Sequence, residues 1–334
     1  MKESLRASSF NRFKSNPSSY IAIGVMGGLF LLISMLIAFI SPTFLLLSVP
    51  LIGFPFLFAS HIASYYLQIN QQVTFSAFLR YYYGFFRAQF RSSFRGIISL
   101  LKSLIFYFVS VLIAALIFVA IFTNKYGSDF TEALTNFVSS YFYSTNITYE
   151  ELIAMLNAND GMLLTFIFYV SAFGIPLAML AFIYYISFAS LSIYYRANVA
   201  FAAPPLLRMT ISNTYSLHRR NMRKDWFVLN WPLLLLSFVG MAGFAVLDIL
   251  VVKRVDLLPA FVIVGGVAML VFYLPFYFTN MEVIYKKYET NFKEGNQRAI
   301  EEVLRKIQNS IDLSEEEKRS LEQSLQGQNS DEEE

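Results

Sequence analysis

The chain of 334 residues contains no cysteine and only two histidines, His61 and His218. The lack of cysteine excludes disulfide bonds, thiolate nucleophiles and cysteine-ligated metal or iron–sulfur sites. Two histidines are also too few for a histidine-rich metal centre. Charge is scarce as well, because 15% of the residues are charged against about 25% in an ordinary soluble domain. These shortages exclude a disordered chain, a soluble two-domain enzyme and a nucleic-acid-binding module.

Apolar and aromatic residues are abundant instead. Hydrophobic side chains make up 56% of the chain and aromatic ones 17%, with 35 Phe and 21 Tyr. The mean hydropathy is +0.51. This is more apolar area than one water-facing surface of a chain this size can accommodate. The composition therefore predicts a polytopic membrane protein of the all-α class.

The apolar residues fall into six stretches that are each long enough to cross a bilayer, which takes about 20 residues. We expect a membrane helix bundle with six transmembrane helices, at about residues 20–40, 44–66, 97–122, 162–185, 227–251 and 258–281. The predicted organisation is an N-terminal segment (1–19), a transmembrane domain (20–282) and a short soluble helical tail (283–334). Gly24-x-x-x-Gly28 in the first span fits a close helix contact.

The distribution of basic residues predicts the orientation. Lys and Arg concentrate in residues 1–19, in 69–96 and between spans four and five, whereas the 123–161 segment sets Lys125 against five acidic residues, Asp129, Glu132, Glu150, Glu151 and Asp160. Basic residues resist translocation across the membrane. We therefore expect both termini in the cytoplasm, the 123–161 loop outside, and a bacterial plasma membrane as the location.

The two basic segments supply the candidate binding residues. On a helix with about 100° per residue, the four arginines of 75–96 fall within roughly 80°, and the aromatic residues gather opposite. This predicts in-plane amphipathic cytoplasmic helices whose rings enter the acyl chains while guanidinium groups meet phosphates. The alternative is a solvated loop whose aromatic side chains pack against the bundle. The candidates for docking anionic lipid or a partner are Arg80, Arg87, Arg91, Arg95, Arg208, Arg219 and Arg223.

A faint internal repeat accompanies these segments. Leu79-Arg80, Arg91 and Arg95 recur 128 residues later as Leu207-Arg208, Arg219 and Arg223. Just upstream, Phe58-Ala59-Ser60 is similar to Phe188-Ala189-Ser190, and a tyrosine pair follows each. A parallel repeat is one interpretation, and compositional coincidence is the other.

Ionisable residues are almost absent from the spans, where they are usually functional. We expect His61 to be a hydrogen-bonded packing residue rather than a proton relay. Asp248 is expected to pair with Lys253 or Arg254. The H-E-x-x-H, G-x-S-x-G and G-x-x-x-x-G-K-[ST] motifs are missing from the sequence. The sequence therefore predicts no catalytic residue, no cofactor and no metal site.

The polar segments contain two helix-start patterns. Thr148-x-x-Glu151 and Ser314-x-x-Glu317 have the spacing of capping boxes. We expect short helices over about 131–143 and 148–157 in the outer loop, and two helices in the C-terminal tail. Residues 326–334 are expected to form a disordered acidic end.

Two functional hypotheses follow. The first is a non-enzymatic membrane protein that works with a cytoplasmic partner, an ATPase or an envelope-assembly factor, as the membrane subunit of an export or transport system or as an assembly scaffold. The placement of its two basic projections is similar to that in six-span ABC-exporter membrane domains, in layout only and with no shared motif. The second is a stand-alone facilitator or lipid-handling protein that binds anionic headgroups through its arginine helices. An enzyme acting on lipid or peptidoglycan precursors comes last, and nucleic acid is not an expected partner.

Overall fold

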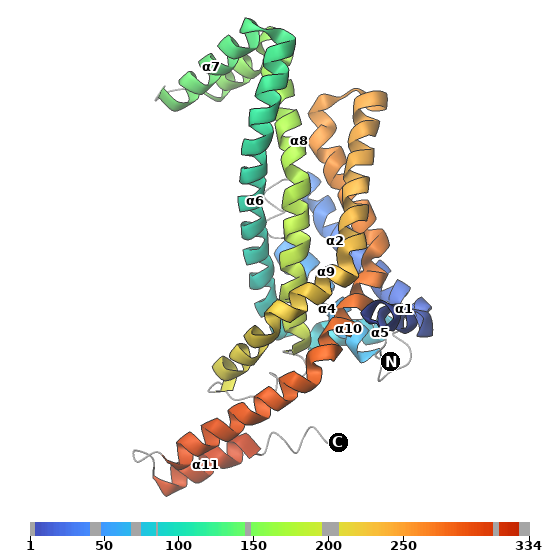
Figure 1. Cartoon of the computed structure of the whole chain (residues 1–334), viewed down its shortest axis with the longest axis vertical. Coiled ribbons are helices and arrows are strands. Elements are labelled where there is room, and N and C mark those ends of the chain that lie inside the picture. Colours follow the sequence, from blue (N-terminus) through green and yellow to red (C-terminus); the bar gives the residue numbers. More distant parts are fainter. Residues whose placement is uncertain are drawn as a thin grey trace. The chain divides into compact units, whose positions relative to one another are not determined.

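The structure is a computed structural model that describes residues 4–40, 48–67, 75–84, 86–143, 148–195, 207–309 and 314–326. Nearly all of these residues are helical, and no strand occurs among them, which confirms the all-α class (Figure 1). The helices are α1 (Leu5–Ser15), α2 (Pro17–Ile40), α4 (Phe54–Tyr66), α5 (Phe75–Gly84), α6 (Phe86–Tyr126), α7 (Ser128–Tyr143), α8 (Tyr149–Tyr195), α9 (Leu207–Leu247), α10 (Leu258–Gln308) and α11 (Glu315–Gln326). A π-helical turn, Val49–Gly53, precedes α4, and a second one, Asp248–Val252, follows α9.

Five described helical stretches are long and apolar enough to cross a membrane. They are Val49–Tyr66, Ser93–Tyr126, Gly161–Leu191, Arg220–Val252 and Val255–Gly295. A shorter apolar stretch, Pro17–Phe30, lies where the first of the six spans is predicted. The chain is therefore a multi-pass membrane protein by the length and composition of its helices.

The chain divides into two compact units. Unit 1 comprises Met1–Ile97, Ile186–Trp231 and Tyr273–Glu334, and unit 2 comprises Ile98–Tyr185 and Pro232–Phe272. The long helices α6, α8, α9 and α10 each contribute residues to both units. This division follows contacts in space, and it cuts across the predicted segments 1–19, 20–282 and 283–334.

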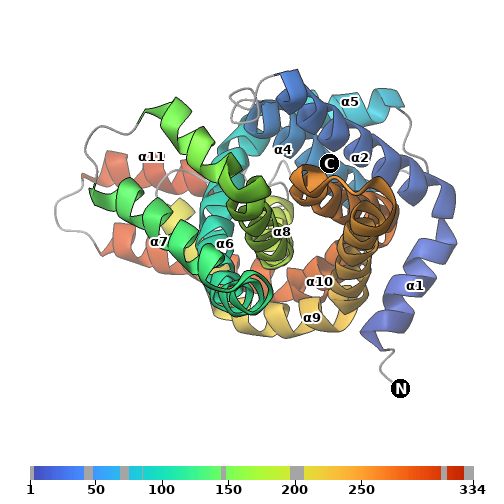
Figure 2. The ribbon, with the colours of Figure 1, turned by 90° about the horizontal axis from the view of Figure 1, so that it is seen from above.

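Unit 2 has an apolar interior. One cluster joins Phe122, Phe130 and Phe166 with Leu156, so that α7 and the first turns of α8 pack on the end of α6. These two segments run side by side in both views (Figures 1 and 2). Gly127 and Gly161 have positive φ angles of +66° and +70°, a left-handed conformation in which glycine avoids the strain of a Cβ atom. The two glycines redirect the chain where α6 meets α7 and within α8.

The predicted outer-loop helices are found in this unit. α7 covers the first of them, and α8 begins at Tyr149 behind a capping box. The backbone N–H of Glu151 donates to the Thr148 hydroxyl (3.3 Å), and the Thr148 N–H donates to the Glu151 carboxylate (2.9 Å). The second predicted helix is not a separate short element, because α8 continues from it through Gly161.

Unit 1 contains α1, α2, α4, α5 and α11 with parts of the four long helices. Close backbone approach packs α2 against two neighbours. A Cβ atom on Gly24 would lie 2.6 Å from the Pro275 ring of α10, and one on Gly27 would lie 2.6 Å from the Ser60 hydroxyl of α4. The predicted close contact is thus confirmed at Gly24, and Gly27 makes a second close approach, toward α4.

The tail helices follow from local sequence. α10 continues without a break from its apolar part to Gln308, and α11 starts at a second capping box. The Glu317 carboxylate accepts hydrogen bonds from the backbone N–H (2.9 Å) and the hydroxyl (2.8 Å) of Ser314. These bonds hold the pKa of Glu317 below its usual value. The predicted disordered acidic end lies almost wholly outside the described residues.

Candidate functional site

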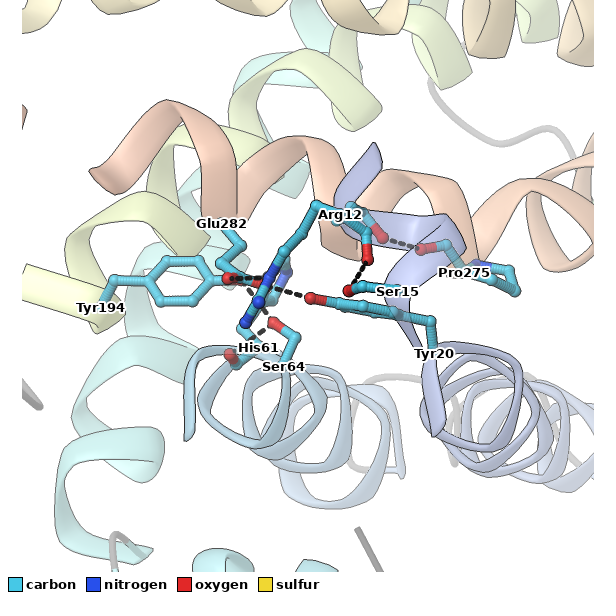
Figure 3. A network of polar contacts seen from close by, with 9 residues as sticks. Arg12, Ser15, Tyr20, His61, Ser64, Tyr194, Pro275 and Glu282 are labelled. Atoms are coloured by element: carbon cyan, nitrogen blue, oxygen red, sulfur yellow. Dashed lines mark hydrogen bonds and ion pairs between the residues drawn. The ribbon is translucent and has the colours of Figure 1, made fainter. Parts of the chain in front are cut away.

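A buried ion pair joins the N-terminal helix to α10 inside unit 1. The Glu282 side chain is fully buried; Arg12 Nε donates to its Oε1 (3.1 Å), and the Tyr20 hydroxyl donates to its Oε2 (2.5 Å). Figure 3 shows these groups converging from α1, α2 and α10. A buried carboxylate is tolerated when its oxygens are paired and hydrogen-bonded. Glu282 is therefore the polar centre of unit 1.

A second set of polar groups lies around His61 on α4. His61 Nδ1 lies 3.0 Å from the Tyr194 hydroxyl, and that hydroxyl lies 2.9 Å from Ser64 Oγ. Ser64 Oγ also donates to the His61 backbone carbonyl (2.8 Å). All three side chains are buried (Figure 3).

Counting protons in this set assigns the histidine tautomer. The single proton of the Ser64 hydroxyl is used on the His61 carbonyl, so Ser64 accepts from Tyr194. Because the Tyr194 hydroxyl donates its one proton to Ser64 Oγ, it accepts a hydrogen bond from His61 Nδ1–H. The ring is therefore assigned as the Nδ1–H form, which leaves the lone pair on Nε2. That buried nitrogen has no hydrogen-bond partner among the described residues. The Tyr277 and Phe278 rings pack against the imidazole in T-shaped geometry.

The two segments of the predicted repeat line the same interior. Ser60 Oγ donates to the carbonyl of Phe56 (3.0 Å), and Ser190 Oγ makes the equivalent bond to Ile186 (2.9 Å). Both serines are fully buried. The like-placed back-bonds are a structural similarity between the segments, while a 128-residue repeat stays a prediction.

A proline in α9 opens a third polar contact. Pro232 has no N–H, so the carbonyl of Val228, four residues earlier, lacks its helical donor. Arg6 Nε on α1 donates to this carbonyl (3.2 Å). The next carbonyl, that of Leu229, lies within hydrogen-bond reach of Asn280 Nδ2 (3.3 Å) and the Tyr273 hydroxyl (3.4 Å). Side chains of α1 and α10 thus cover the carbonyls at the proline.

Asn280 connects this contact to the N-terminal helix. Its Oδ1 accepts from Ser9 Oγ (2.5 Å), and its Nδ2 lies 3.0 Å from Asn230 Oδ1. Neither the Arg12–Glu282 pair nor the Arg6 contact was among the sequence predictions. Pro232 was the available signal, because a proline inside a predicted span indicates a free carbonyl.

The predicted docking arginines are only partly described. Arg80 on α5 and Arg223 on α9 are exposed, and the Arg223 guanidinium lies 5.9 Å from the Phe188 ring centre. Arg95 is half-buried and has partners of its own. The side chains of four further arginines lie outside the described part of the chain: Arg87, Arg91, Arg208 and Arg219.

Within the 75–96 segment, the described residues form α5 up to Gly84 and the start of α6 from Phe86. The Tyr82 ring stacks on Phe56 of α4 (4.3 Å between ring centres). Phe78 is fully buried near the same ring. These two aromatic residues therefore pack against the bundle, as the alternative interpretation of this segment states.

The expected pairing of Asp248 is wrong. Both of its carboxylate oxygens are buried without a hydrogen-bond partner among the described residues. Arg254 instead forms two hydrogen bonds with Asp256 (3.0 and 2.8 Å). The reason is local, because Lys253 adopts a left-handed conformation (φ 56°) at the end of the π-helical turn. The Arg254 guanidinium then meets Asp256, two residues ahead, rather than Asp248, six residues earlier.

These groups join helices of unit 1 to one another. In the His61 set a tyrosine hydroxyl stands between the histidine nitrogen and the serine, whereas a nucleophile and its base need a direct hydrogen bond. Among the residues with described placement, no three His, Asp or Glu side chains lie together as metal ligands. No protein family, curated protein or solved structure that was compared matches this chain.

Proposed function

We propose that the protein is a non-enzymatic integral membrane protein that works with a cytoplasmic protein partner, as the membrane subunit of an export or transport system or as an envelope-assembly scaffold. In this proposal α2 also crosses the bilayer, which gives six spans. Both termini lie in the cytoplasm, and the membrane is a bacterial plasma membrane.

The observation that carries the proposal is an exposed basic surface at the start of the α9 span. Arg220, Arg223 and Lys224 are exposed, whereas the neighbouring Asp225 is drawn inward. Asp225 Oδ2 accepts hydrogen bonds from Lys287 Nζ (2.7 Å) and from the Tyr288 hydroxyl (2.7 Å). Because Asp225 is neutralised on the inner side, its charge does not offset the exposed cations. An acidic partner surface complements them.

Unit 1 is also suited to bind a partner, because polar contacts between its helices hold them together. Arg12–Glu282, Asp225–Lys287 and Tyr65–Glu289 (2.9 Å) all fasten another helix to α10. A partner that binds unit 1 would therefore act on α10, which continues into an apolar stretch long enough to span the membrane. This continuity supports a role in transmitting partner binding to the membrane.

The test replaces the exposed cations by glutamine, as R220Q/R223Q/K224Q. A photoreactive residue at position 221 reports the partner, and vesicles containing phosphatidylglycerol report lipid binding. We expect crosslinking to the partner to fall at least tenfold while vesicle binding persists. The matched control, R298Q/R305Q/K306Q, removes three exposed cations of α10 and should change neither. Unchanged crosslinking in R220Q/R223Q/K224Q would reject the proposal.

A second candidate is a stand-alone lipid-handling protein, and one observation favours it. On α5 the exposed Arg80 lies three residues before Tyr83, whose side chain is 71% exposed. An exposed aromatic ring beside an arginine is typical of a helix at the headgroup boundary. R80Q discriminates the two candidates. Loss of vesicle binding with crosslinking from position 221 retained supports lipid handling, and vesicle binding that persists in R80Q counts against it.

A further inference from the structure

The N-terminal helix α1 has one face that is fastened to α10 and one exposed face, called here the free face, from which Arg6 Nε also reaches the Val228 carbonyl of α9. The fastened face contacts α10 through Ser9, Arg12 and Phe13, the last of which stacks on Phe276 (4.4 Å between ring centres). On a helix with 100° per residue, Arg6, Phe10 and Lys14 fall within about 80° of one another. All three are exposed, and Phe10 is 59% exposed although it is a large apolar side chain.

The free face is positively charged. α1 contains three basic residues and no acidic one. Arg12 is paired with Glu282, so the charges left on the free face are those of Arg6 and Lys14. Arg6 uses Nε on the Val228 carbonyl, and the donors of its two terminal nitrogens are not used in any described hydrogen bond. A guanidinium fork of this kind matches the oxygens of a phosphate.

α1 lies beside two apolar helices, α2 and α10. Asn16 caps α1, and Pro17 opens α2, whose apolar stretch is Pro17–Phe30. α1 lies against α10 within the part of that helix that belongs to a candidate span, and both views show it beside α2 and α10 (Figures 1 and 2). A helix that adjoins the start of one apolar helix and packs on another lies where headgroups begin.

We propose that α1 is an in-plane membrane anchor whose Arg6–Phe10–Lys14 stripe binds the phosphate headgroups of anionic phospholipids. The Phe10 ring enters the acyl boundary, and the two cations on either side of it bind phosphates. Because Arg6 also donates to the Val228 carbonyl, bound lipid keeps α1 at this carbonyl of α9. This inference concerns a different surface from the docking face Arg220–Lys224 and does not depend on it.

The experiment uses the full chain in nanodiscs. Since the protein has no cysteine, Phe10→Cys accepts a spin label without removing any native group elsewhere. In nanodiscs of phosphatidylcholine with phosphatidylglycerol, we expect the label to be shielded from a water-soluble relaxant and accessible to oxygen. A label at Ser320→Cys on the exposed face of α11 supplies the water-accessible reference. Equal relaxant access at the two positions would overturn the anchor.

The charge variants test the headgroup. R6Q/K14Q should lower the affinity of the purified protein for phosphatidylglycerol roughly thirtyfold, since each of the two basic residues near the surface adds about 1 kcal/mol of attraction. R298Q/K306Q, which removes two exposed cations of α10, should retain it. K14Q alone touches no interior contact, so its smaller loss cannot come from misfolding. Retention by R6Q/K14Q equal to that of the control would contradict the proposal, as would equal displacement by inorganic phosphate.

Discussion

The helix α10 packs by two different means along its length. In unit 2 its Gly265 meets Gly240 of α9 so closely that a Cβ atom on Gly240 would lie 2.4 Å from the Gly265 carbonyl oxygen. In unit 1 the same helix presents Tyr277, Asn280 and Glu282 to polar partners. Both parts of α10 use close packing, since Gly24 of α2 also approaches the Pro275 ring in unit 1. Unit 1 adds buried hydrogen bonds to this packing.

This difference indicates where function is expected. Close packing of glycines fixes distance but responds to no chemical signal, whereas buried ionisable groups respond to charge and to partners. Because unit 1 contains the buried Arg12–Glu282 pair and also carries the exposed cations Arg220, Arg223 and Lys224, we propose that it is the part of the protein that responds to a partner.

The largest expected effect comes from removing the Glu282 carboxylate, the polar centre of unit 1. Glu282→Leu leaves Arg12 and the Tyr20 hydroxyl without their acceptor. We expect the free energy of unfolding in mixed micelles, measured by SDS titration, to fall by roughly 3 kcal/mol. Glu282→Gln keeps an acceptor oxygen and should lose less. A Leu variant as stable as the wild type would show that the polar centre contributes nothing.

The corresponding change in unit 2 is Gly240→Ala, and we expect a smaller loss of about 2 kcal/mol. The added methyl group meets a backbone carbonyl rather than a flexible side chain, so α9 and α10 must separate. Gly243→Ala is the matched control, because a Cβ atom there has nothing within 4 Å. The same titration measures both variants, and equal stability of the two would contradict the close-packing account.

A third change removes one hydroxyl from the His61 set. Tyr194→Phe leaves His61 Nδ1–H without its acceptor and Ser64 without a donor, and about 1–2 kcal/mol of unfolding free energy should be lost. The imidazole ¹⁵N spectrum provides the sharper measurement. The wild type should show the Nδ1–H tautomer, and the variant should lose that preference. A wild-type spectrum of the Nε2–H tautomer would refute the assignment.

The smallest effect concerns pH at the solvent-facing capping box of α11. The pKa of Glu317 is lowered in the folded state, so its contribution is complete above the unfolded value and is lost as the pH falls through the folded value. Backbone NMR shifts of Glu315–Gln326 should therefore report fraying in acid. In Ser314→Ala this pH response should weaken, and an identical response would exclude the capping box as its origin.

Local patterns in the sequence were sufficient for some of these features. Both capping boxes were predicted because their partners are three residues apart, and the Gly24 contact because small residues allow close approach. The pairing of Asp248 was predicted wrongly from proximity along the chain alone. Proximity says nothing about which of two acids Arg254 meets once Lys253 turns left-handed.

The interior of unit 1 could not be predicted in this way. Arg12 and Glu282 are 270 positions apart, and a glutamate at the end of a predicted span looks like an interfacial residue. Pro232 does indicate that the Val228 carbonyl is free, but nothing in the sequence identifies Arg6 as the donor. Such pairs depend on which helices meet in space.

A double-mutant cycle on Arg12 and Glu282 tests the polar interior of unit 1 most directly. Arg12→Leu and Glu282→Leu are measured singly and together by SDS titration. If the pair is a buried, mutually satisfied contact, the double variant should be more stable than the sum of the two losses predicts, with a coupling of about 2 kcal/mol. Losses that simply add would mean that the two groups do not interact, and would contradict a hydrogen-bonded interior built on α10.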